Sequence, residues 1–204
     1  MEIEKRECIL QAASRAFSRF GFKKASIDEI AKAAGVAKGT VYLACESKED
    51  LFYQAVHRDL RGWISECSKL IDPRVNADKL LETVVRASVV YLGGKPLVRD
   101  LLSGTYGKLL PAWEDRMNEL RVLGRANTTE ILALGIKQGR FRKDLDIDLV
   151  ASLLQDLHIA SYLFHGKELS DKPELWLPRF KAALDLLLHG LMTPKASAEA
   201  IASG

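Results

Sequence analysis

The sequence predicts an all-α protein, and three observations support this. Apolar residues recur at helical spacing along the 204 residues, no run of alternating apolar and polar residues indicates a half-buried strand, and typical helix-ending residues interrupt the pattern at intervals. With 48% hydrophobic and 28% charged residues, the chain has enough apolar material for an ordinary core. We therefore expect a globular, soluble protein.

The first predicted helix spans about residues 4–20 and ends at Gly21, because glycine commonly follows the last turn of a helix. Its apolar face comprises Ile9, Ala12, Ala13, Ala16, Phe17 and Phe20. Such a face must pack against neighbouring elements.

A second helix is predicted to begin after Ser26, which forms a capping box with Glu29, and to end at Gly35. A short third helix follows after two or three residues and runs from about residue 37 or 38 to Ala44. The small Ala31 allows the two helices to approach, and three apolar residues fill the angle between them: Ile30, Val36 and Val41. This arrangement is typical of a helix-turn-helix, although the pattern alone also allows a helical corner with no role in DNA binding.

The fourth helix is predicted to begin after Ser47, with Asp50 as its capping partner, and to extend toward Ile71. Further helices are expected at about 77–92, 96–109, 113–138, 147–165 and 172–192, with breaks at Gly93-Gly94, Pro111, Gly139 and Gly166. We divide the chain into an N-terminal unit of residues 1–50, a larger unit of residues 51–194 and a disordered tail of residues 195–204.

Positive charge gathers at the N-terminal end. Residues 1–48 hold nine Lys and Arg against six Asp and Glu, whereas the remaining residues hold 21 of each, so this end supplies the whole net charge of +3. Such a basic region is a modest indication of nucleic-acid binding, because a solvated helical surface has similar composition.

The cysteines Cys8, Cys45 and Cys67 are odd in number and match neither a disulfide framework nor a metal-binding CxxC pair. The N-terminus has no apolar export signal, and no stretch approaches the roughly 18 apolar residues of a membrane span. We expect a cytoplasmic protein with no membrane partner.

Many positions of the N-terminal unit match a known pattern. These are Ile9-Leu10-Gln11-Ala12-Ala13, Phe17, Gly21, Ile30-Ala31, Gly35-Val36-Ala37-Lys38-Gly39-Thr40-Val41-Tyr42 and Ser47-Lys48-Glu49-Asp50-Leu51. Over residues 5–55 the chain thus resembles the DNA-binding domain of the TetR family, whose signature reads Gly-Val-Ser-Lys-Gly-Thr-Leu-Tyr-x-x-Phe-x-Ser-Lys-Glu. The rest resembles the family in length, helix content and the closing residues 187–191.

The resemblance implies a bacterial transcriptional regulator that binds palindromic double-stranded operator DNA as a homodimer. Ser26, Tyr42 and Lys48 are the candidate phosphate contacts, while Lys38, Gly39 and Thr40 begin the recognition helix that approaches base edges.

The sequence departs from the family at Leu43, Ala44 and Cys45, where the family has two polar or aromatic residues and then a phenylalanine. The recognition helix therefore offers few base-reading side chains, which favours backbone and shape readout. We interpret Cys45 as a small buried substitute for the phenylalanine. A redox sensor stays open, because a nearby Lys38 or Lys48 would lower the pKa of the thiol.

The resemblance also implies a small-molecule effector that binds the C-terminal unit and releases the repressor from DNA. Candidate effector-binding residues, chosen by type, are Trp63, Tyr91, Tyr106, Trp113, Met117, His158 and Tyr162. The last two long helices are expected to pair with those of a second copy through Leu153, Leu157, Phe180, Leu184, Leu187, Leu188 and Leu191. Core packing explains the effector candidates equally well.

No catalytic pattern is present. His158 and His165 lie two helical turns, about 10 Å, apart and cannot share a metal, and the glycine-rich segments at 93–96 and 104–108 lack the spacing of a phosphate loop. We therefore expect no enzyme activity, metal or cofactor. A helical protein-interaction module remains a rival, which failure to bind duplex DNA would favour. Repression and activation are both compatible with the sequence.

Overall fold

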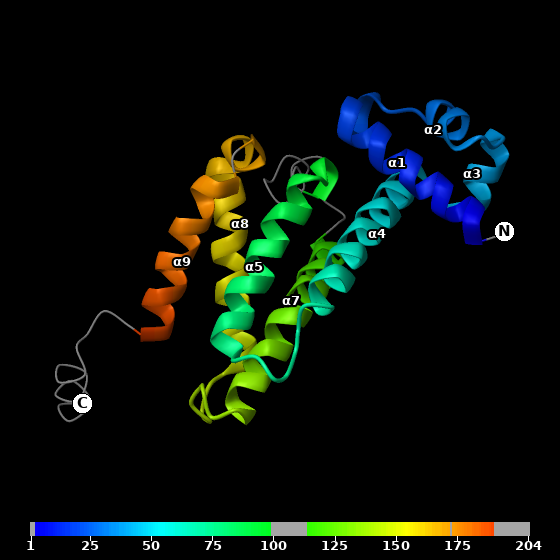
Figure 1. Ribbon diagram of the computed structural model, residues 1–204. Helices are drawn as coiled ribbons and strands as arrows, with labels where there is room; N and C mark the ends of the chain where they lie inside the picture. The colour runs from blue at the N-terminus through cyan, green and yellow to red at the C-terminus, as the bar shows by residue number, and fades with distance from the viewer. Residues whose placement is uncertain (1–2, 99–113, 172, 190–204) are drawn as a thin grey trace.

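The computed structural model describes residues 3–98, 114–171 and 173–189, and the regular structure of these residues is entirely helical (Figure 1). The predicted all-α fold is thus confirmed. The helices are α1 (Ile3–Lys24), α2 (Ile27–Ala34), α3 (Lys38–Ala44), α4 (Lys48–Ser68), α5 (Ala77–Gly93), α7 (Glu114–Lys137), α8 (Ile147–Asp171) and α9 (Pro173–His189).

Helices α1, α2 and α3 form a compact unit around the first part of α4 (Figure 1). The rings of Phe17, Phe22 and Phe52 form its aromatic centre, with centroids 5.0 to 5.9 Å apart. The predicted break at Gly21 is present as a kink with φ of 74°, after which helical structure continues to Lys24. The prediction that Phe20 lies on the buried apolar face was wrong. Phe20 directly precedes this kink and is 41% exposed.

The short helices begin and end as predicted. Ser26 Oγ accepts the Glu29 N–H, and the Glu29 carboxylate accepts the Ser26 N–H, so the capping box that begins α2 is complete. Gly35 ends α2 in the left-handed conformation, with φ of 69°. At the start of α4, Ser47 Oγ accepts the Asp50 N–H, and Asp50 Oδ2 accepts the N–H of Glu46. The predicted Ser47 cap is therefore present.

Helix α4 connects the N-terminal unit to the C-terminal helices (Figure 1). Its first turns bury Leu51, Phe52 and Val56 against α1, and its later turns bury Leu60 and Cys67. These residues belong to one hydrophobic cluster that extends from α1 to α9. The two units therefore share a helix and a core.

Helices α5, α7, α8 and α9 lie alongside one another beyond α4 (Figure 1). One predicted boundary here was wrong. Gly166 lies inside α8 rather than ending it, because a lone glycine weakens a helix by only about 1 kcal/mol and packing overrides that preference. Pro178 lies inside α9, in agreement with the single helix predicted at 172–192. No helix within the described ranges is both long and apolar enough to cross a membrane.

Of the helix predicted at 96–109, residues 96–98 are helical and residues 99–109 lie outside the described residues, as does the tail at 195–204.

The Gln138 amide fixes the connection between α4 and α5. Its Oε1 accepts the Ala77 N–H at 3.0 Å, and its Nε2 donates to the carbonyl oxygens of Pro73 and Val75, each at 2.9 Å. A single side chain just after α7 thus satisfies three backbone groups of this loop. The loop is consequently attached to the C-terminal unit at the end of α4.

Candidate nucleic-acid interface and ligand cavity

Helix α3 presents one face to solvent. Val41 is fully buried against the N-terminal core, whereas Lys38, Gly39, Tyr42 and Leu43 are exposed. Three of the sequence-predicted contact residues, Lys38, Gly39 and Tyr42, therefore share the exposed side. Thr40, the fourth candidate on this helix, is half-buried.

Lys38 forms an ion pair within the helix-turn-helix. Its Nζ lies 2.8 Å from Asp28 Oδ2 on α2, and this hydrogen bond together with the carboxylate charge raises the pKa of Lys38. Both side chains are more than half exposed, so solvent screens the pair. The ammonium can exchange this carboxylate for a DNA acceptor at little cost.

Two of the three phosphate candidates, Lys48 and Ser26, also have partners in the protein. Lys48 Nζ donates to the carbonyl oxygen of Lys23 at 3.2 Å and lies 4.9 Å from the centroid of the Phe22 ring. These contacts hold the ammonium at the junction of α1 and α4. The Ser26 hydroxyl bonds to Glu29 in the capping box. Helix capping therefore explains why a serine stands at this position, without a phosphate contact.

Cys45 is buried, as the preferred interpretation predicted, with only 5% of its surface exposed. Its Sγ lies 3.3 Å from the Val41 carbonyl oxygen, and burial, followed by the charge of Asp50, raises the pKa of the thiol. The redox interpretation required a lowered pKa, and this premise was wrong. The loss of hydration on burial disfavours the thiolate.

A buried carboxylate, missed by the sequence analysis, joins three segments. Asp59 on α4 is 1% exposed; its Oδ2 accepts from Ser14 Oγ of α1 at 2.6 Å, and its Oδ1 lies 2.6 Å from Arg58 Nη1 and 3.5 Å from Lys95 Nζ. We call Ser14, Arg58, Asp59 and Lys95 the Asp59 cluster. Arg58 also donates to Glu7 of α1. An acid on the apolar face of the fourth helix, between Val56 and Leu60, was the available signal.

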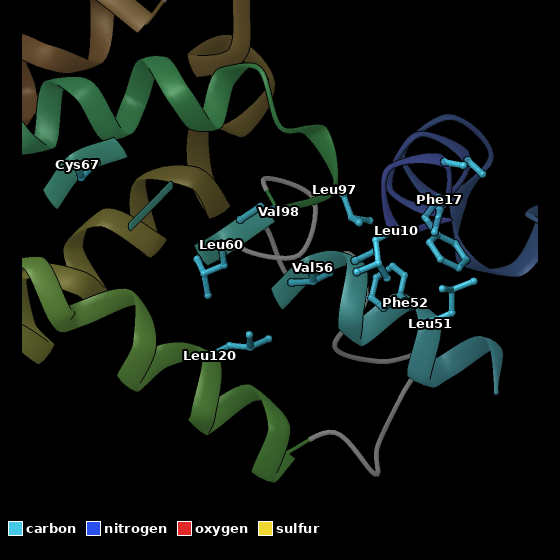
Figure 2. Close-up of a cluster of buried hydrophobic side chains, with 14 of the residues drawn as sticks. Leu10, Phe17, Leu51, Phe52, Val56, Leu60, Cys67, Leu97, Val98 and Leu120 are labelled. Atoms are coloured by element: carbon cyan, nitrogen blue, oxygen red, sulfur yellow. The ribbon is translucent and has the colours of Figure 1, made fainter. Parts of the chain in front are cut away.

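The segment after α5 packs against both units. Leu97 and Val98 are almost fully buried, and Figure 2 shows the Leu97 side chain directed toward Leu10 of α1 in a shared cluster. Since Lys95 belongs to the Asp59 cluster, residues 95–98 provide polar and apolar contacts at the junction of the units. A movement of α5 would reach α1 through this segment.

The C-terminal unit encloses a small cavity with a free volume of about 50 Å³. Apolar side chains form much of its wall, and polar groups enter from α5, α7 and α8. Its lining residues are Trp63, Leu81, Val84, Val85, Ser88, Gly124, Asn127, Thr128, Leu154, Gln155, His158 and Leu184. Trp63 Nε1 donates to Ser88 Oγ at 2.6 Å and thereby ties α4 to α5 across the cavity.

Two of the predicted effector residues, Trp63 and His158, line this cavity. Burial lowers the pKa of His158 to about 4, so the imidazole is neutral at pH 7. Tyr91 does not line the cavity: its hydroxyl fills space beside Gly62, where a Cβ atom would lie 2.5 Å from it. Of the other candidates, Tyr106, Trp113 and the side chains of Met117 and Tyr162 lie outside the described residues.

Exposed leucines occur on both α8 and α9. Leu153 is 49% exposed and Leu187 is 54% exposed, while Leu157 is half-buried. The prediction that Leu184 lies at the dimer interface was wrong. This side chain is 5% exposed and lines the cavity, so it belongs to the core of the protomer. The side chains of Phe180 and Leu188 and the whole of Leu191 lie outside the described residues.

A helix-turn-helix with an exposed third helix, joined through a shared helix to a larger helical unit with a cavity, defines a class of DNA-binding regulators. Residues 9–55 match the family model described as bacterial regulatory proteins, tetR family. Residues 9–55 thus form a DNA-binding domain of the TetR type, which supports a transcriptional regulator rather than an enzyme.

Two curated relatives illustrate the extent of the similarity. The HTH-type transcriptional regulator YhgD of Bacillus subtilis is 34% identical over 73 residues, which cover 36% of this chain and 38% of YhgD. The fatty acid metabolism regulator protein of the same organism is 25% identical over 147 residues, which cover 72% of this chain and 75% of that protein.

Two solved structures extend the similarity over nearly the whole chain. FadR from Bacillus subtilis, in complex with stearoyl-CoA, has a TM-score of 0.76 and 22% identity, covering 91% of this chain and 99% of that one. FadR from Thermus thermophilus, a repressor in complex with lauroyl-CoA, has a TM-score of 0.65 and 26% identity, covering 92% and 95%.

Proposed function

We propose that this regulator is a homodimeric repressor that binds a palindromic operator and is released when a fatty acyl-CoA enters the C-terminal cavity. The observation that carries the proposal is the position of Trp63, which lines the cavity from the same helix that packs against the DNA-binding unit. The choice of ligand class draws on the Thermus thermophilus repressor, at 26% identity, and on the Bacillus subtilis fatty acid regulator.

The cavity must enlarge to hold such a ligand. Its free volume is about 50 Å³, whereas ligand pockets typically measure about 300–1,000 Å³. An acyl chain would therefore displace lining side chains such as Trp63, Val84 and Leu154 and favour a more open arrangement of α4, α5 and α8. A ligand that prefers this arrangement lowers the affinity for DNA. Bound DNA lowers the affinity for the ligand by the same factor, typically about 5- to 150-fold.

Exposed leucines on α8 and α9 support the proposed dimer. Leu149 and Leu153 lie one helical turn apart on α8, and Leu186 and Leu187 are about half exposed on α9. Pairing with a second copy would bury these side chains and place two recognition helices on successive major grooves, about 34–36 Å apart.

The test begins with selection of an operator from a random duplex library by the full-length protein. Operator affinity is then measured with acyl-CoA esters of increasing chain length, with CoA alone and with free fatty acids. We expect long-chain esters to lower the affinity at least fivefold and CoA alone to have no effect. Saturating binding of an ester with unchanged operator affinity would refute ligand release.

A cavity-filling variant provides the matched control for the site. Val84→Phe places a ring in the cavity, whereas Val122→Phe changes an exposed valine of α7 that is outside it. Val84→Phe should bind operator normally and lose the response to acyl-CoA, while Val122→Phe should retain both properties. Equal responses in the two variants would place the ligand elsewhere.

A further inference from the structure

Leu43 is exposed on the recognition helix. It is 80% exposed, the most of any large apolar side chain from α2 onward in the described part of the chain. A single exposed leucine is common on protein surfaces and requires no explanation by itself. Its position, however, is on the helix that meets the major groove in this class of protein.

Gly39, one helical turn before Leu43, is a second observation on the same face. Glycine is less favourable than alanine inside a helix, so its presence calls for a left-handed conformation or a close neighbour. Gly39 has no positive φ, and among the described residues nothing lies within 4 Å of the place where its Cβ would stand. The fold of this chain therefore does not require a glycine here.

An approaching surface accounts for both features. A missing side chain at Gly39 lets the helix backbone come close to a partner, and the Leu43 side chain then projects into that partner. Because the recognition helix of a helix-turn-helix binds DNA, we take the operator as the partner of this face. This step rests on the proposed function, in which the protein binds operator DNA.

Leucine has no hydrogen-bonding group, so it cannot read the donors and acceptors of base edges. In the major groove, the 5-methyl group of thymine is the apolar feature that distinguishes one base from the others. We propose that Leu43 contacts a thymine methyl in each half of the operator and so determines specificity at that position. The helix thus reads sequence by an apolar contact as well as by backbone and shape.

Operator selection gives the first test. The wild type should enrich a site with a strongly preferred thymine in each half, and Leu43→Ala should enrich the same site with that preference reduced. Leu43→Gln should shift the preference toward adenine, because its amide can pair with adenine N6 and N7. Val122→Ala, which shortens an exposed valine on α7, is the control and should keep the wild-type site.

A single-methyl change in the DNA gives the second test. Deoxyuridine replaces the preferred thymine and removes only the methyl group. Wild-type affinity should fall about fourfold per half-site, as expected for one buried methyl-sized group, whereas Leu43→Ala should bind both duplexes equally. When deoxyuridine replaces any other thymine of the site, the change in affinity should be the same for the wild type and Leu43→Ala. Circular dichroism and thermal melting verify that each variant is folded.

The outcomes separate this inference from the function on which it rests. If the wild type enriches no sequence, the proposed operator binding fails. If a site is enriched but the methyl effect is absent, or is equal in wild type and Leu43→Ala, the role of Leu43 is refuted while operator binding stands. A change in the oligomeric state of free Leu43→Ala would also refute it, because the leucine would then contact a second copy.

Discussion

Ser14 Oγ on α1 donates a 2.6 Å hydrogen bond to Asp59 Oδ2 on α4, and it joins residues 45 positions apart in the sequence. Asp59 is almost completely buried, and the two cations on its other oxygen, Arg58 and Lys95, compensate its charge. The Asp59 cluster therefore lies where the DNA-binding unit, α4 and the segment after α5 meet, on the route by which we propose that the cavity influences DNA binding.

Removal of the Ser14 hydroxyl should weaken both stability and coupling. Ser14→Ala deletes a hydrogen bond to a charged acceptor, so the free energy of unfolding should fall by about 1.5 kcal/mol in urea denaturation. The factor by which acyl-CoA lowers operator affinity should also decrease. Thr83→Ala is the matched control, because the hydroxyl of the exposed Thr83 donates to the Lys79 carbonyl oxygen of its own helix. Equal effects of the two changes would contradict a role for the cluster.

The dimer can be tested at its exposed leucines. Leu153→Glu combined with Leu187→Glu places two charges on the side of α8 and α9 where we propose that a second copy packs. We expect a folded monomer in sedimentation analysis, with operator affinity lost because one half-site binds too weakly. Val122→Glu, another exposed position, should remain dimeric. A dimeric double variant would place the interface on a different surface.

Acid should destabilise the protein through His158. The pKa of this residue is about 4 in the folded chain and about 6.5 in the unfolded chain. As pH falls from 6.5 to 4, the unfolded state binds a proton that the folded state excludes, so the free energy of unfolding decreases by roughly 3 kcal/mol at most.

His158→Gln should flatten this part of the pH profile in chemical denaturation. Thr128→Val changes the same cavity without altering a titrating group and should retain the wild-type slope. A wild-type slope in His158→Gln would show that other groups cause the loss.

Lys48 is expected to contact a phosphate. Lys48→Ala should weaken binding to all DNA sequences alike and reduce the slope of log affinity against log salt by about one unit per half-site. Lys69→Ala removes a lysine at the far end of α4, which pairs with Glu66, and should leave the slope unchanged. If the slope is the same in Lys48→Ala and wild type, the contacts with Lys23 and Phe22 are the whole role of Lys48.

Thiol labelling should distinguish the three cysteines. Cys8 is exposed, whereas Cys45 and Cys67 are buried and burial raises the pKa of both thiols, which lowers their thiolate fractions. One fast and two slow reactions with a thiol reagent are expected in the native protein, and Cys8→Ser should remove the fast one. Rapid modification of Cys45 in that variant would revive the redox interpretation.

Local signals in the sequence predicted the helix-turn-helix closely. Ser26, Glu29 and Gly35 act on backbone groups within a few residues, so their pattern defines α2 without knowledge of the rest of the fold. Gly166 and Pro178 are also residues that locally disfavour a helix, yet α8 and α9 continue through them. Packing between long helices overrides the local preference at those positions, and the sequence does not display that packing.

Residues that act at long range were harder to predict. Helix α8 is apolar on several sides, so spacing alone could not tell which side faces the protomer core. On α9, Leu184 and Leu187 lie three residues apart, but one is buried and the other is exposed. The role of Asp59 likewise depends on Ser14 and Lys95, which are distant in the chain. Only the three-dimensional arrangement brings these groups together.

Gln138 bonds the loop after α4 at Pro73 and Val75, so a rigid rotation of α4 about its end near Ser68 would act as a lever. At about 1.5 Å per residue, Trp63 lies about 8 Å from that end and Lys48 lies about 30 Å from it. A ligand that pushes Trp63 by about 0.5 Å would swing Lys48 by about 2 Å. Such a rotation would magnify a small displacement in the cavity about fourfold at Lys48, where we propose that the protein contacts its operator.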